Sequence, residues 1–152
     1  MTTLTSIEQN ITPYPHFTAV TALLGRIGLA AIFFISGINK IQFYEGNAQF
    51  LASGGLPEWM LPFVIIFEIG GATALIIGFK VRAAALAFAA FSIVTALLYH
   101  NNLADQIQFI LFFKNMATAG GFLILVSHGA GPLRLKFSKN NRLEKTPPQI
   151  CA

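Results

Sequence analysis

The sequence predicts an all-α integral membrane protein, a four-helix bundle with a short interfacial helix in the first loop. Three observations support this fold class. Of the 152 residues, 55% are hydrophobic and only 11% are charged, whereas a typical soluble domain carries about 25% charged residues. Four apolar segments each approach the ~20 residues that a helix needs to cross a bilayer. The basic residues gather on one side of these segments, as they do in membrane proteins.

This composition argues against a soluble enzyme, a disordered chain and a nucleic-acid-binding protein. The net charge of +4 would suit a nucleic-acid partner, but the basic tail has no interleaved aromatic residues on which bases could stack. The single cysteine, Cys151, excludes an internal disulfide and a site built from several thiolates.

The predicted spans are justified by their apolar length and by their low charge. The first is interrupted only by Arg26, the second only by Glu68 and the fourth only by Lys114, while the third has no charge. The spans cover residues 17–38, 59–79, 83–99 and 107–126.

The first loop is the longest connection and contains a second helical pattern. Phe43, Phe50 and Leu51 recur at helical spacing with polar residues between them, which predicts an amphipathic helix over 42–52 lying on the outer interface. The glycine- and proline-containing segment 53–57 ends it.

The distribution of lysine and arginine predicts the orientation. Only Lys40 lies on the side opposite the termini. Seven basic residues share the side of the termini: Lys80, Arg82, Arg134, Lys136, Lys139, Arg142 and Lys145. Both termini are therefore expected in the cytoplasm. The chain divides into a polar segment 1–16, a membrane domain 17–133 and a basic tail 134–152.

Three charged residues lie inside the predicted spans, where a charge costs about 2.5–3.5 kcal/mol and requires a partner or a function. At ~1.5 Å per residue, Glu68 and Lys114 are expected roughly 14 and 10 Å below the outer surface, and Arg26 roughly 18 Å. The prediction is an acid between two bases, facing the bundle interior.

One carboxylate cannot neutralise two cations, so the cluster would keep a surplus positive charge. A bound anion or a quinone oxygen would match that charge. A buried ion network that only fixes helix register, or a neutral Lys114, would explain the same residues.

A second polar cluster is expected at the outer ends of the spans. Lys40 follows the first span, His100 follows the third, and Asn115 adds an amide near Lys114. The candidate polar cavity is thus formed by Arg26, Glu68, Lys114, His100, Lys40 and Asn115. No catalytic residue is assigned, and no metal site is expected, because the three histidines have no ligand spacing.

Several of these residues lie in motifs that carry a family resemblance over about Leu24–Leu133. The motifs are Gly25-Arg26, Ser36-Gly37-Ile38-Asn39-Lys40, Leu51-Ala52-Ser53-Gly54-Gly55-Leu56-Pro57, Glu68-Ile69-Gly70-Gly71, Leu98-Tyr99-His100 and Phe113-Lys114-Asn115. In this order they resemble the DoxX family of small four-span membrane proteins. The resemblance implies a bacterial inner membrane protein. Some members of the family are subunits of membrane redox systems, but the resemblance implies no agreed set of catalytic residues.

Three functions remain open at this point. The first is a quinone-linked component or accessory subunit of a membrane oxidoreductase system, with no intrinsic cofactor and with quinone as the candidate ligand. The others are a non-catalytic membrane anchor or assembly partner and a small-solute or proton transporter. The expected partners are membrane lipids, an oxidoreductase subunit that is soluble or membrane-bound, and a second copy of the chain, but no nucleic acid.

Overall fold

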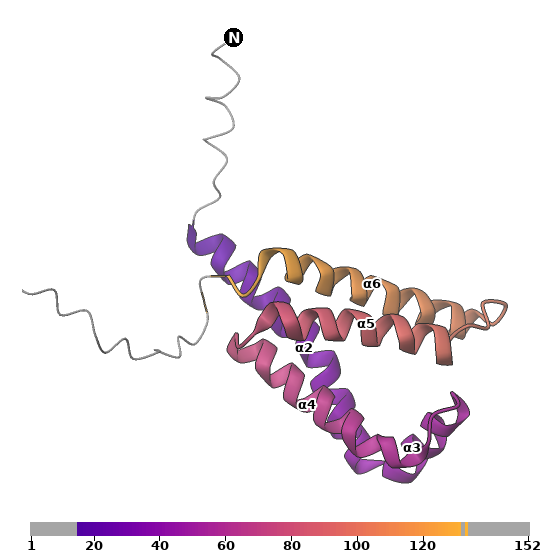
Figure 1. The fold of residues 1–152 in the computed structure, drawn as a ribbon. Helices are drawn as coiled ribbons and strands as arrows, with labels where there is room; N and C mark the ends of the chain where they lie inside the picture. Colours follow the sequence, from indigo (N-terminus) through magenta and orange to yellow (C-terminus); the bar gives the residue numbers. More distant parts are fainter. Residues whose placement is uncertain (1–14, 132, 134–152) are drawn as a thin grey trace, which may run out of the picture.

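The computed structural model describes residues 15–131 and Leu133, and this part of the chain is helical without any strand. The elements in chain order are α2 (Pro15–Gln42), α3 (Tyr44–Ser53), the 3-10 helix η1 (Glu58–Met60), α4 (Leu61–Ile77), α5 (Val81–Tyr99) and α6 (Gln106–His128) (Figure 1). The tail 134–152 and all but the last two residues of the segment 1–16 lie outside the described residues.

Four of the helical segments are long and apolar enough to cross a membrane, as the sequence predicted. They are Ala19–Gln42, Glu58–Ile77, Val81–Tyr99 and Gln106–His128. The second span ends earlier than predicted because Gly78 adopts a left-handed conformation, with φ 84° and ψ 21°, that closes the helix. The first continues four residues beyond Ile38 and brings Lys40 into the helix.

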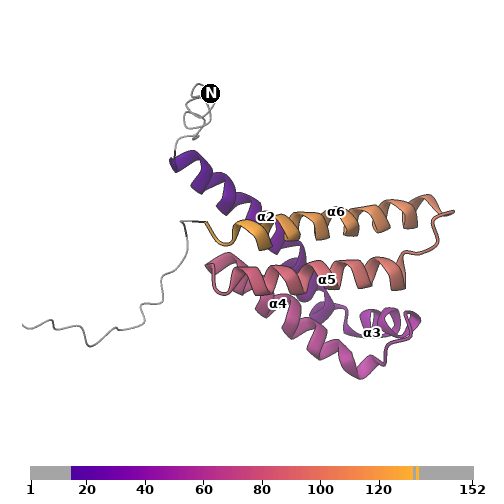
Figure 2. The ribbon, with the colours of Figure 1, turned by 45° about the horizontal axis from the view of Figure 1, so that its top comes forward.

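The helices pack as two antiparallel pairs. α2 packs mainly on α4, and α5 packs mainly on α6. In both views the two pairs cross, lie closest near the turn from α4 to α5, and separate toward α3 (Figures 1 and 2). The bundle is therefore wedge-shaped, with its wide end where α3 lies.

Phenylalanine rings fill the space between the pairs. The ring centroids of Phe33 and Phe88 are 4.4 Å apart, and those of Phe88 and Phe122 are 5.4 Å apart. Phe88 and Phe122 are fully buried. Gly71 makes this packing possible, because a Cβ atom there would lie 2.8 Å from the Phe88 ring.

The first loop contains a short helix, α3, close to the range that the amphipathic pattern predicted. Its buried residues Ala48 and Leu51 pack with Leu61 at the start of α4. The position of α3 relative to a membrane surface stays a prediction. Within the protein, α3 covers the wide end of the wedge.

Candidate functional site

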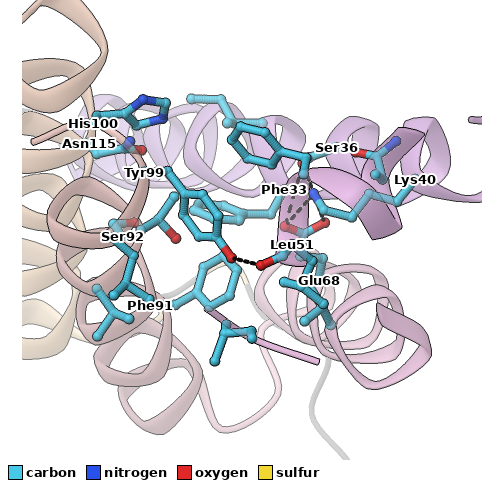
Figure 3. Close-up of a pocket in the computed structure, with 18 of the residues that line it drawn as sticks. Phe33, Ser36, Lys40, Leu51, Glu68, Phe91, Ser92, Tyr99, His100 and Asn115 are labelled. Atoms are coloured by element: carbon cyan, nitrogen blue, oxygen red, sulfur yellow. Dashed lines mark hydrogen bonds and ion pairs between the residues drawn. The ribbon is translucent and has the colours of Figure 1, made fainter. Parts of the chain in front are cut away.

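A pocket of about 240 Å³ lies between the two helix pairs near α3 (Figure 3). All five α-helices contribute to its lining, because the pairs separate at this end. Most lining side chains are aliphatic or aromatic, among them Phe33, Phe50 and Phe91. The polar groups are concentrated on the α2–α4 wall and on the α5–α6 wall.

The α2–α4 wall carries an ion pair between Lys40 and Glu68. The Lys40 Nζ atom lies 2.9 Å from both Glu68 Oε1 and Glu68 Oε2. Nζ also donates to Ser36 Oγ over 2.6 Å, one helical turn earlier on the same face of α2. The Glu68 side chain is only 3% exposed, and that of Lys40 is 19% exposed. The pair is neutral as a whole, so this wall leaves no charge to be matched.

The opposite wall carries Lys114, Asn115 and His100. His100 Nδ1 lies 2.8 Å from Gln108 Oε1 and donates to this oxygen. Lys114 lines the pocket from α6 and is exposed. Within the described part of the chain, the one ion pair is Lys40–Glu68, and no hydrogen bond joins the Lys114 ammonium to another group. Lys114 therefore brings an uncompensated positive charge to the pocket.

Tyr99 connects the two helix pairs at the wide end of the wedge. Its hydroxyl donates to the Leu51 carbonyl oxygen over 3.0 Å, and its ring stacks on Phe50 with centroids 4.7 Å apart. Gly54 leaves room for the ring, since a Cβ atom there would clash with it. Tyr99 thus holds α3 against α5 beside the pocket (Figure 3).

The structure brings five of the six candidate cavity residues to this pocket. Glu68, Lys114, His100, Lys40 and Asn115 all line it. Arg26 does not line it, and Glu68 pairs with Lys40 instead of standing between Arg26 and Lys114. Arg26 and Ser36 are ten residues apart on α2, about 15 Å along the helix axis, which is too far for an arginine side chain to reach Glu68.

Arg26 instead joins α2 to the end of α4 and to the segment that follows α6. Its Nη1 donates to the Ala130 carbonyl oxygen over 2.6 Å. Its Nη2 donates to the carbonyl oxygens of Ile76, over 3.2 Å, and Leu133, over 2.9 Å. Ile76 is in the last turn of α4, where carbonyl groups lack partners within the helix and the helix dipole favours a cation.

Sequence reasoning missed Ser36 and Tyr99 as site residues, although both stand in the quoted motifs. The signal for Ser36 was its position four residues before Lys40, which puts both side chains on one helix face. Nothing in the sequence alone indicates that the Tyr99 hydroxyl reaches a backbone carbonyl 48 residues away.

These residues fall largely inside a region shared with known proteins. A model of the DoxX family matches residues 21–101, which is more than half of the chain. The chain belongs to the DoxX family. The match includes Lys40, Glu68 and Tyr99, whereas Lys114 and the rest of α6 lie beyond it.

Among curated proteins, this DoxX-family chain is similar to two inner membrane proteins of Escherichia coli (strain K12). It is 40% identical over 112 residues to Inner membrane protein YqjF, covering 74% of this chain and 86% of that protein. It is 33% identical over 123 residues to Inner membrane protein YphA, covering 76% of this chain and 88% of that protein.

A third relative comes from Bacillus subtilis (strain 168) and is named "Putative oxidoreductase CatD". The identity is 34% over 70 residues, covering 46% of this chain and 52% of that protein. No solved structure matches the chain.

Proposed function

We propose that this DoxX-family chain is a multi-pass inner membrane protein that binds a quinone in the pocket beneath α3. In this role it is a component or accessory subunit of a membrane oxidoreductase system. The observation that carries the proposal is Lys114, which lines a mostly apolar pocket and whose ammonium has no ion-pair or hydrogen-bond partner among the described residues, while the acid opposite is already paired. The inner membrane relatives and the oxidoreductase named among the relatives support this setting.

The lining fits the chemistry of a quinone. A quinone ring is flat and apolar at its faces, and its carbonyl oxygens accept hydrogen bonds. Phe33, Phe50 and Phe91 offer aromatic surface, while Lys114 and Asn115 offer donors on α6. The volume of about 240 Å³ suits a head group, so an isoprenoid tail would extend into the lipid.

The residues of this chain have distinct roles in the proposal. Lys114 and Asn115 hold and orient a carbonyl oxygen through charge-assisted and amide hydrogen bonds. Lys40 and Ser36 orient the Glu68 carboxylate at the opposite wall. A bound quinone would supply the redox chemistry, and the partner oxidoreductase would supply the electrons.

The proposed orientation places both termini in the cytoplasm and the pocket in the outer half of the membrane. The basic residues of the second loop and the tail support it through the positive-inside rule. A fluorescent reporter that folds only in the cytoplasm, fused after Ala152, is expected to be active, and alkaline phosphatase at the same site inactive. The reverse pattern would overturn the orientation.

The proposed ligand is tested by the quinone content of the full chain, purified from native membranes in mild detergent. Wild-type protein is expected to retain close to one quinone per chain. Lys114→Met should lower that content about tenfold or more, since a hydrogen bond from a charged donor contributes about 1.5–3 kcal/mol. The content is measured by extraction and chromatography.

Lys114→Arg serves as the matched control because it keeps the charge and the donors, and it should retain most of the quinone. Thermal unfolding of each variant shows that the fold is intact. A wild type without quinone, or a Lys114→Met variant with an unchanged content, would refute the ligand and favour the membrane anchor.

A further inference from the structure

A second pocket lies at the opposite end of the bundle, where α4 turns into α5 and α6 ends. Its volume is about 800 Å³. Lys80, Arg82 and His128 line it, together with small residues around Gly78 and Gly129. All three basic side chains are exposed. No acidic residue lines this pocket.

The positive charge at this end has no counterpart among the described residues. Their acidic side chains belong to the other half of the molecule. Glu68 is paired with Lys40, Glu45 lies in α3, Glu58 begins η1 and Asp105 caps the start of α6. An anionic ligand at the second pocket would therefore meet several cations and no repulsive carboxylate from the described part of the chain.

The surrounding groups add to this positive potential. Buried Arg26 donates to the carbonyl oxygen of Ala130, a lining residue, and its three partners are neutral carbonyl groups. Among the described residues, the Arg82 guanidinium donates only to the Ser127 carbonyl oxygen, over a long 3.4 Å. Neither arginine is neutralised by the part of the chain that the structure describes.

The backbone of Lys80 gives a separate reason to assign a role to its side chain. Its φ of 42° is the one positive φ of a non-glycine residue among the described residues. Such a conformation is unfavourable for a side chain with a Cβ atom, and glycine would adopt it readily. The backbone conformation of the turn would therefore favour glycine at position 80 and does not explain why lysine stands there. Strained residues of this kind cluster at binding sites.

The second pocket also lies at one end of three candidate spans. Two of them end there, at Ile77 and His128, and the third begins there, at Val81. The ends of spans that cross a bilayer lie near the lipid head groups. We propose that this pocket binds the phosphate group of an anionic phospholipid through Lys80 and Arg82, with His128 at its rim. The proposal does not depend on which side of the membrane this end faces.

The test measures lipid binding by the full chain in nonionic detergent. Phosphatidylglycerol, phosphatidylcholine or inorganic phosphate is titrated, and bound molecules are counted by native mass spectrometry. Wild-type protein is expected to retain one phosphatidylglycerol in preference to phosphatidylcholine. Lys80→Gln with Arg82→Gln should weaken phosphatidylglycerol binding about tenfold or more, because each basic residue near a lipid surface contributes about 1 kcal/mol.

Two further variants separate a built site from general attraction. Lys80→Arg with Arg82→Lys keeps both charges and should preserve binding, while Lys136→Gln with Lys139→Gln removes two charges from the tail and should change it little. An equally large loss with the tail variant, equal binding of the two lipids, or binding of inorganic phosphate as tight as that of the lipid would overturn the proposal.

Discussion

Replacing Lys40 with methionine is expected to lower the free energy of unfolding by about 3–5 kcal/mol, the cost of removing one partner from a buried ion pair. The Glu68 carboxylate receives both of its short contacts from Lys40 and one long contact, 3.4 Å, from Ser36. With 3% of its side chain exposed, the carboxylate has little contact with solvent that could replace the lost ammonium. The shift is measured by thermal or denaturant unfolding in detergent.

A double-mutant cycle shows whether the loss comes from the pair itself. Glu68→Gln alone should cost less than Lys40→Met, because the Lys40 side chain that it leaves unpaired is 19% exposed. Lys40→Met with Glu68→Gln should recover much of the stability, since no buried charge then remains on the α2–α4 wall of the pocket. Lys114→Met, compared with wild type in the absence of quinone, is the matched control and should leave stability almost unchanged. A Lys40→Met variant as stable as wild type would show that the pair contributes little.

The four spans could be predicted from the sequence because long apolar runs leave few alternatives for a chain with so little charge. The end of the first span differs from the prediction, and this difference changes the partner of Lys40. Ending the first span at Ile38 placed Lys40 in a separate outer cluster, whereas α2 continues to Gln42. The lysine then stands on the same helix face as Ser36, within reach of Glu68.

The pairing of the charges could not be predicted from depth alone. Distance along the membrane normal brought Arg26 and Lys114 close to Glu68, but depth says nothing about which helices are adjacent or which faces meet. The partners of Arg26 were also invisible, because they are backbone carbonyl groups. Every residue type has a carbonyl group, so no pattern of side chains marks a group at a helix end that needs a donor.

Arg26→Met is expected to destabilise the protein by at least about 3 kcal/mol, since a hydrogen bond with a charged partner contributes about 1.5–3 kcal/mol and three are lost. Arg26 is 2% exposed, and it joins α2 to the end of α4 and to the segment after α6. Arg26→Lys should recover only part of the loss, because an ammonium group cannot reproduce the planar fork of the guanidinium.

The control is Arg82→Lys, which changes an exposed arginine near the same turn and should alter stability little. Unfolding and the quinone content are both measured. Together they distinguish a structural role of Arg26 from a role in the pocket. If Arg26 only joins the helices, Arg26→Met lowers the stability, and the molecules that are correctly folded keep their quinone. If Arg26→Met unfolded like wild type but lost the quinone, Arg26 would belong to the pocket, as the depth argument first predicted, and its carbonyl contacts would be incidental.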